Sequence, residues 1–270
     1  MARNPRRPVA EPVPAAPATA SRAGRVDALR GLAVAWMTVY HFAFDLNHFG
    51  HIRQNFYTDP VWTWQRTAIV SLFLFTAGLS QALAVASGQD WPRFWRRWRE
   101  VALCALLVTA ASWWMYPRSF IHFGVLHGLA VMLVLTRWIA LRPGTRDAAL
   151  VLAGALCIGL YHAWFAAAGT LLPPAWIEAL NGRVLNPIGL VTRKPVTEDY
   201  VPVLPWLGVM LWGLAAGRWI ARRRPSALAA ALPAAATPLA WLGRWSLSWY
   251  MLHQPVLIGS LMAVSFLRGA

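Results

Sequence analysis

The chain has 270 residues, of which 58% are hydrophobic and 17 are Trp, whereas an average soluble domain has roughly 45–50% apolar residues. A soluble protein of this length would need an implausibly large core, so the composition excludes an ordinary soluble domain and indicates that a membrane solvates much of the apolar surface. The formal net charge of +15 does not indicate nucleic-acid binding, because the basic residues are divided among separate loops.

The first segment, residues 1–24, combines five Pro and seven Ala with scattered Arg. This composition predicts a disordered cytoplasmic tail, followed by a membrane domain over residues 25–270. The tail is not a secretory signal, because the first apolar run begins late, contains His41 and Asp45, and is not followed by a small-residue cleavage pattern.

Seven apolar runs follow, and each is long enough to cross a hydrocarbon core of about 30 Å as a helix. They cover residues 31–47, 67–86, 98–116, 123–139, 148–168, 203–220 and 247–266. The predicted fold is therefore all-α: a polytopic helical bundle with about seven transmembrane helices. Glycines in several runs predict close contacts between helices, namely Gly78, Gly124, Gly128, Gly208, Gly213 and Gly217.

Basic residues alternate between dense and sparse loops along the chain. Eighteen of the 25 Lys and Arg residues fall on the side of the tail. The other side holds seven, which are Arg53, Arg66, Arg118, Arg183, Arg193, Lys194 and Arg268. This pattern predicts a cytoplasmic N-terminus and a multi-pass protein of the inner (plasma) membrane, with anionic lipids as partners and no nucleic acid.

Two connections differ from the short turns between the other runs. Residues 169–201 form a long, turn-rich outer segment of the kind that often serves as a lid or binding loop, and Trp176 to Leu180 within it can form a helical turn. The Ala-rich stretch 226–241 contains Pro233 and Pro238 and is short for a span, so we expect it at the cytoplasmic interface.

The first run carries ionisable residues at membrane depth, which are costly there and tend to be functional. Arg30 lies at the cytoplasmic edge, and His41 follows eleven residues later, roughly 16 Å deeper along a helix. Asp45 lies one turn further on the same face, where a carboxylate can orient an imidazole and raise its basicity. His41 therefore suits a general base. The alternative is a purely structural pair.

Further polar residues at depth could line the same cavity, although each has a structural alternative as a hydrogen-bond partner between helices. They are His122, His127, His162, His253 and Gln254. Arg66 either snorkels to the outer surface or pairs with Asp45 or a substrate, and Trp206 either walls a substrate site or belongs to an interfacial belt. The imidazoles lack the spacing of a metal site, and Cys104 and Cys157 are expected only to pack, so no metal is expected.

Several segments of the sequence resemble one family. The motifs are Val26-Asp27-Ala28-Leu29-Arg30-Gly31, Tyr40-His41-Phe42-Ala43-Phe44-Asp45, Phe123-Gly124-Val125-Leu126-His127, Asp199-Tyr200-Val201-Pro202 through Trp206, and Tyr250-Met251-Leu252-His253-Gln254-Pro255. They are similar to bacterial relatives of the catalytic domain of heparan-alpha-glucosaminide N-acetyltransferase, within the wider transmembrane acyltransferase group.

The resemblance implies transfer of an acyl group, usually acetyl from cytosolic acetyl-CoA, to an amine or hydroxyl of a sugar or glycan-type acceptor across the membrane. Acetyl-CoA would be a co-substrate, with no bound cofactor. His41 and Asp45 would be catalytic, Arg30 would bind acyl-CoA, and candidate substrate-site residues are His51, Arg66, His127, Asp199, Trp206, His253 and Gln254.

One departure from the family concerns the base. The lysosomal member has Asn where His41 stands and a His near the position of His51. His41 is favoured because it lies at depth beside Asp45, whereas His51 falls in a solvated loop. Two other classes stay open from the residues alone: a proton-coupled transporter or flippase that uses His41 and Asp45 as a relay, and a structural subunit. Homo-oligomerisation is also open.

Overall fold

The computed structural model describes residues 24–267, so the predicted tail lies outside the described residues except for Gly24, at which the first helix begins. Within this range the chain forms helices and no β-strand, apart from one isolated bridge between Phe123 and Tyr200. The long helices are α1 (Gly24–His48), α2 (Pro60–Ala86), α3 (Trp91–Met115), α4 (Val125–Leu141), α5 (Asp147–Leu171), α7 (Val203–Arg223) and α10 (Ser246–Leu267). The short ones are α6 (Pro174–Asn181), η1 (Asn186–Ile188), α8 (Pro225–Ala229), η2 (Ala234–Ala236) and α9 (Thr237–Arg244).

Each of the seven apolar runs lies largely or wholly within one of the long helices, but α2 and α3 begin earlier than expected. Asp59 caps α2 by accepting a hydrogen bond from the Val61 amide at 2.8 Å, and Asp90 caps α3 by accepting one from the Arg93 amide at 3.0 Å. A proline near the start of each helix reinforces these caps. Hydropathy misses the first turns because polar and charged residues, such as Gln65 and Arg66 in α2 and Arg93 and Arg96 in α3, are interspersed with the apolar ones there.

Four helices of the described part of the chain are long and apolar enough to cross a membrane: α2, α5, α7 and α10. Helix α4 is apolar but has 17 residues, and α1 and α3 have 25 residues each but carry more polar residues. The all-helical membrane architecture is thus confirmed. The count of seven spans and the cytoplasmic N-terminus stay predictions.

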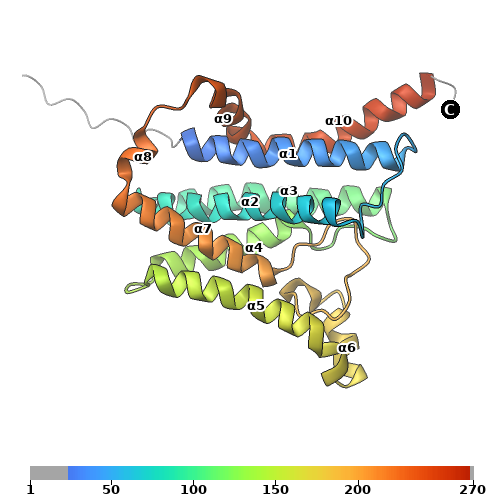
Figure 1. The fold of residues 1–270 in the computed structure, drawn as a ribbon, viewed down its shortest axis with the longest axis horizontal. Coiled ribbons are helices and arrows are strands. Elements are labelled where there is room, and N and C mark those ends of the chain that lie inside the picture. Colours follow the sequence, from blue (N-terminus) through green and yellow to red (C-terminus); the bar gives the residue numbers. More distant parts are fainter. Residues whose placement is uncertain (1–23, 268–270) are drawn as a thin grey trace, which may run out of the picture.

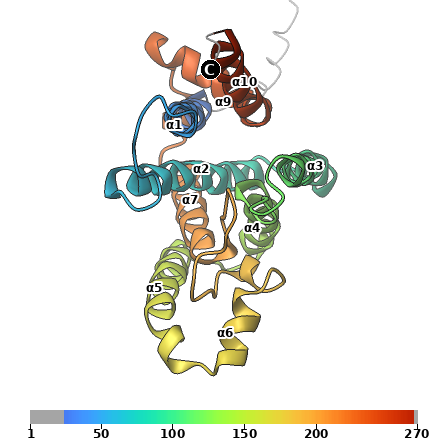
Figure 2. The same cartoon turned by 90° about the vertical axis from the view of Figure 1, so that its right-hand side faces the viewer.

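The helices are arranged in three layers (Figures 1 and 2). Helices α1, α9 and α10 form the first layer, α2 lies with α3, α4 and α7 in the middle, and α5 and α6 lie on the far side. The middle layer supplies most of the largest apolar cluster, which includes Leu74 of α2, Leu126 and Met132 of α4, and Met210 of α7. The layer of α1 and α10 therefore covers one side of the middle layer.

Glycines set the spacing between α2 and α7. A Cβ atom on Gly213 would lie 2.0 Å from the carbonyl oxygen of Phe75, and one on Gly78 would lie 2.0 Å from that of Met210. Only glycine allows the two backbones to approach this closely. The expectation that Gly78 and Gly213 permit close helix contacts is confirmed.

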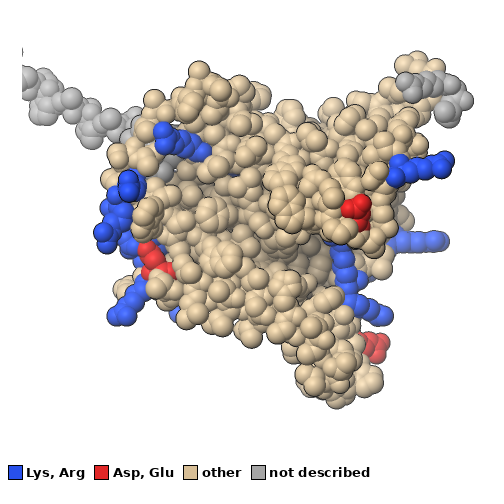
Figure 3. Space-filling model, in the orientation of Figure 1, with Lys and Arg blue, Asp and Glu red and all other residues tan. Residues whose placement is uncertain are grey.

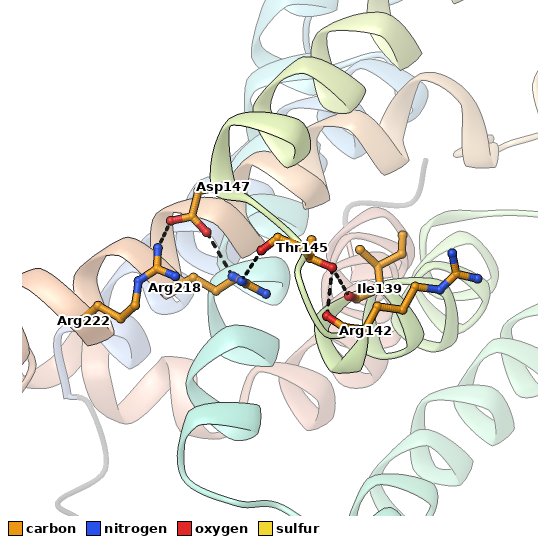
Figure 4. A network of polar contacts seen from close by, with 6 residues as sticks. All are labelled: Ile139, Arg142, Thr145, Asp147, Arg218 and Arg222. Atoms are coloured by element: carbon orange, nitrogen blue, oxygen red, sulfur yellow. Dashed lines mark hydrogen bonds and ion pairs between the residues drawn. The ribbon is translucent and has the colours of Figure 1, made fainter.

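A polar network fixes the turn between α4 and α5 against the end of α7 (Figure 4). Arg218 Nε donates to Asp147 Oδ1 at 3.0 Å, and its Nη2 donates to the Thr145 carbonyl at 2.7 Å. Arg222 donates to the other carboxylate oxygen of Asp147. These contacts tie together basic residues at the end of the bundle where the chain enters α1.

The surface of the helices is apolar between two charged ends. Figure 3 shows Lys and Arg concentrated at the two ends of the long axis, with mostly uncharged residues between them. Helix α5 buries only Leu150, Gly154 and Ala168 of its 25 residues, and Leu152 and Leu160 are about three-fifths exposed, at 61% and 63%. An apolar band of this extent is what a lipid-facing surface requires.

Candidate active site

Helices α1 and α10 bring His41 and His253 into direct contact. His253 Nε2 lies 3.0 Å from His41 Nδ1, and the ring centroids are 5.0 Å apart. The two residues are 212 positions apart in the chain, and α1 and α10 pack against each other along the first layer. Two candidate residues of the sequence thus form one site.

The backbone fixes which nitrogen of each neutral ring carries a proton. His253 Nδ1 lies 2.7 Å from the carbonyl oxygen of Tyr250, and a carbonyl oxygen can only accept, so this nitrogen carries the hydrogen. His253 Nε2 is then an acceptor, and His41 must donate to it through Nδ1–H. The lone pair of His41 is therefore on Nε2.

His41 Nε2 has no hydrogen-bond partner among the described residues, and it is not one of the buried unpaired atoms. His41 itself is half-buried. An oriented imidazole with an accessible, unprotonated nitrogen is the arrangement that a general base needs.

Asp45 lies next to this pair but does not orient His41. Its side chain is 3% exposed, and its Oδ1 accepts a hydrogen bond from Gln254 Nε2 at 3.4 Å. The expected support of His41 by Asp45 is not present, because His253 from α10 takes that place. Asp45 Oδ2 and Gln254 Oε1 are both buried without a partner, so two acceptor atoms remain unsatisfied close together.

His127 lies in a separate network within the middle layer. The Gly124 amide donates to His127 Nδ1 at 3.3 Å, so Nε2–H donates to Thr109 Oγ1 at 3.0 Å, and Thr109 donates in turn to the Ile121 carbonyl at 2.7 Å. Every polar atom of this imidazole is paired. The structure does not bring His127 into the His41 pair.

Asp199 lies in the loop before α7 and caps α4. Its Oδ2 accepts a hydrogen bond from the Val125 amide at 2.6 Å, and a Cβ on Gly124 would come within 2.4 Å of this oxygen. Desolvation raises the pKa of Asp199, whereas the Val125 hydrogen bond and the charge of Lys194 lower it. Asp199 therefore has a clear structural role at the end of the bundle opposite the entry to α1.

The family comparison covers this whole arrangement. A model of the family described as "Heparan-alpha-glucosaminide N-acetyltransferase, catalytic" matches residues 22–255. The chain belongs to this family. The resemblance seen in the sequence is thereby confirmed, and membership supports a membrane acyltransferase in general while giving no support to the transporter alternative. Neither the curated proteins nor the solved structures give a match.

The matched region contains both histidines considered as the base. His51 lies in the turn between α1 and α2, is exposed, and makes no side-chain hydrogen bond with any described residue. His41 is the one held by a partner ring. In this family member the geometry thus distinguishes the two imidazoles, although it does not test their roles.

Arg30 joins three helices at the opposite end of α1. It donates to Asp27 Oδ1 at 3.0 Å and to Ser80 Oγ of α2 at 2.6 Å, and it lies 3.5 Å from the Gly243 carbonyl of α9. These contacts fix the position of its guanidinium, whose side chain is still 20% exposed. Any role in donor binding would add to this structural one.

Two remaining candidates do not join the pair of His41 and His253. Trp206 of α7 is half-buried against the largest apolar cluster. Arg66 of α2 is half-buried and forms no ion pair with Asp45 or any other described carboxylate.

Sequence reasoning missed the pairing of His41 with His253. The only local feature that bears on it is the hydrogen bond from His253 to the Tyr250 carbonyl, and this bond does not indicate which residue of α1 lies opposite.

Proposed function

We propose that this chain transfers an acyl group, most simply acetyl, from cytosolic acetyl-CoA to an amine or hydroxyl of a sugar or glycan-type acceptor on the far side of the inner membrane. His41 is the general base. The observation that carries the proposal is the oriented imidazole of His41, whose lone pair on Nε2 has no partner among the described residues.

The position of His41 along α1 suits transfer across the membrane. It lies eleven residues from Arg30 and seven residues before the end of α1 at His48, which correspond to roughly 16 Å and 10 Å along the helix. The basic end of the bundle carries Arg30 and the exposed α3 cluster of Arg93, Arg96, Arg97 and Arg99. These cations would hold the phosphates of CoA while its long pantetheine arm brings the thioester toward His41.

The reaction needs one proton acceptor and one leaving group. The acceptor nitrogen or oxygen attacks the thioester carbonyl and gives its proton to His41 Nε2. The C–S bond then breaks, and the thiolate of CoA takes up the proton from the imidazolium. His253 stabilises this imidazolium by accepting the now charge-assisted hydrogen bond from His41 Nδ1. An acyl-His41 intermediate would use the same lone pair.

The unpaired oxygens of Asp45 and Gln254 supply a site for the acceptor. Both are hydrogen-bond acceptors, both are buried, and leaving such groups unsatisfied costs about 1–3 kcal/mol each. An amine or hydroxyl-rich substrate would donate to them. We therefore assign Asp45 and Gln254 to binding of the acceptor substrate. In this proposal His253, and not Asp45, orients the base His41.

Purified protein in nanodiscs, supplied with acetyl-CoA and a panel of amino sugars and neutral sugars, tests the proposal. We expect acceptor-dependent release of the CoA thiol and an acetylated product by mass spectrometry. His41→Ala should remove both, whereas His51→Ala should retain them. Activity in His41→Ala together with its loss in His51→Ala would reassign the base to the outer turn, and proton-coupled uptake without acetylation would favour a transporter.

A further inference from the structure

A basic pocket lies at the end of the bundle opposite the entry to α1. It has a volume of about 430 Å³ and lies between the turn that joins α3 to α4 and the loop that follows α6. Its lining residues are Arg118, His122, Asn181, Arg183, Asn186, Arg193, Lys194, Pro195 and Val196. No residue of α1 or α10 lines it, so it is separate from the His41–His253 pair.

The charged residues that line this pocket are all basic. Four cations line it and no carboxylate does, and none of these four forms an ion pair with a described residue. Two acids lie outside the lining: Glu198 accepts from the Ser119 hydroxyl at 2.5 Å, and Asp199 accepts from the Val125 amide while its charge acts on Lys194 without forming an ion pair. The pocket is thus strongly positive.

Internal contacts hold the walls of the pocket in place. Asn181 donates to Thr192 Oγ1 at 2.8 Å and accepts from the amides of Thr192 and Arg193 at 3.1 and 3.2 Å, which closes the loop on itself. Arg183 lies over the Phe120 ring at 4.9 Å. The loop backbone that carries Arg193 is therefore held in place, and Arg183 is positioned against Phe120.

Buried polar groups complete the frame. Asn186 is 1% exposed, its Oδ1 lies 3.1 Å from His122 Nε2, and its carbonyl accepts from the Tyr200 hydroxyl at 2.6 Å. Since the amide oxygen is an acceptor, His122 donates to it. A buried, hydrogen-bonded asparagine that lines a basic hollow distinguishes this pocket from a chance group of surface cations.

The electrostatics around Lys194 favour an anion. Although part of the side chain is exposed, desolvation lowers the pKa of Lys194, and the charge of Arg66 lowers it further, while Asp199 partly opposes them. An anion in the pocket would relieve this crowding of positive charge.

The distribution of basic residues along the sequence adds an independent argument. On the side of the membrane that the charge pattern places outside, cations are few. Four of the seven line this single pocket. This concentration of cations on a side that is otherwise poor in them favours an anionic ligand for the pocket.

We propose that this pocket binds a phosphate group, or a pair of linked phosphates, with the guanidinium groups of Arg118, Arg183 and Arg193 as the principal ligands. The oxygens of a phosphate can accept hydrogen bonds from several guanidinium groups at once. A single carboxylate would leave most of the four positive charges without a counter-charge. The phosphate could belong to a soluble compound or to a lipid headgroup at the membrane surface. Both sources share this chemistry.

The test is titration of inorganic pyrophosphate into the full chain in phosphatidylcholine nanodiscs, measured by calorimetry. The variant is R118Q/R193Q, because neither side chain makes a hydrogen bond or ion pair with a described residue. The matched control is R223Q/R224Q, which removes the same charge from exposed residues at the opposite end of the bundle. The single variant R118Q replaces the double one if thermal unfolding shows that the latter is unstable.

We expect saturable binding to the unchanged protein and to R223Q/R224Q, and binding at least about tenfold weaker in R118Q/R193Q; R118Q alone should also bind more weakly than the control. Phosphatidylglycerol in the nanodiscs identifies the source, since competition with pyrophosphate indicates a lipid headgroup and unchanged binding indicates a soluble phosphate. Absence of saturable binding, or equal losses in the pocket and control variants, would overturn the proposal. None of these outcomes depends on acyl transfer.

Discussion

Two imidazole sites of the same molecule differ in one respect. The His127 site is complete: both ring nitrogens are hydrogen-bonded, and the chain of bonds ends on a backbone carbonyl. The His41 site is incomplete: one ring nitrogen is held by His253, the other is unpaired, and two acceptor oxygens beside it are unsatisfied.

The difference separates structural from chemical roles. Buried polar groups are normally paired, because an unpaired one costs free energy. Unpaired polar groups next to an oriented base can form hydrogen bonds with a substrate, whereas a network in which every polar group is already paired cannot. Substitutions in the two sites should therefore have opposite effects on turnover and on stability.

The largest effect on turnover should come from His41→Ala. General-base catalysis typically contributes about 10²–10⁴, so the turnover number should fall more than a hundredfold. Acetyl-CoA affinity should change little, because the proposed phosphate contacts lie at the other end of α1. Single-turnover acetylation and equilibrium binding of a non-hydrolysable acetyl-CoA analogue measure the two quantities, and near-normal turnover in the folded variant would contradict the mechanism.

A smaller loss should follow from His253→Ala, because His253 positions the base. Misplacement of a catalytic group costs about ten- to a hundredfold. His253→Gln should recover part of the loss, since its amide oxygen can accept from His41 Nδ1. The turnover number should fall while the KM for acetyl-CoA stays constant. If Ala and Gln at this position were equally active, the contact between the two rings would have no catalytic role.

The third substitution, Asp45→Asn, acts on acceptor binding. The amide keeps an oxygen acceptor but loses the negative charge, so the KM for the acceptor should rise by about two- to tenfold, with a smaller change in the turnover number. Saturation curves with the acceptor varied at fixed acetyl-CoA show the split. A fall in the turnover number as large as that of His41→Ala, with unchanged KM for the acceptor, would show that Asp45 supports His41 in catalysis and does not bind the acceptor.

Much of the fold could be predicted from the length of the apolar runs. Each of the seven runs lies largely or wholly within one long helix because lipid-length helices need long apolar stretches. The early starts of α2 and α3 could not be read in this way, since Asp59 and Asp90 cap helices whose first residues mix apolar side chains with polar and charged ones. Hydropathy reports the apolar part of a helix and not its ends.

The candidate site was only partly predictable. His41 and His253 could be singled out because ionisable residues at depth are costly. Their pairing could not, because it depends on how α10 lies against α1, more than 200 residues later. The pairing of Arg30 with Ser80 is of the same kind. Local spacing suggested that Asp45 supports His41, but the neighbouring helix supplies a better-placed partner.

The smallest effect on turnover, and the reverse pattern, should come from His127→Ala. Removing this ring leaves the Gly124 amide without its side-chain acceptor and Thr109 Oγ1 without one donor, which should lower the free energy of unfolding by about 1–3 kcal/mol. The turnover number of the folded protein should stay within about twofold of normal, because no step of the proposed reaction passes through this ring. Thermal unfolding in nanodiscs and turnover corrected for the folded fraction measure the two effects. Thr109→Val is a comparison that removes the hydrogen bond to His127 from the other side, together with the one to the Ile121 carbonyl. If His127→Ala instead kept full stability and lost turnover, the proposed distinction would be wrong. A fully hydrogen-bonded imidazole would then be catalytic, and unpaired ring nitrogens would not identify the catalytic histidine of this chain.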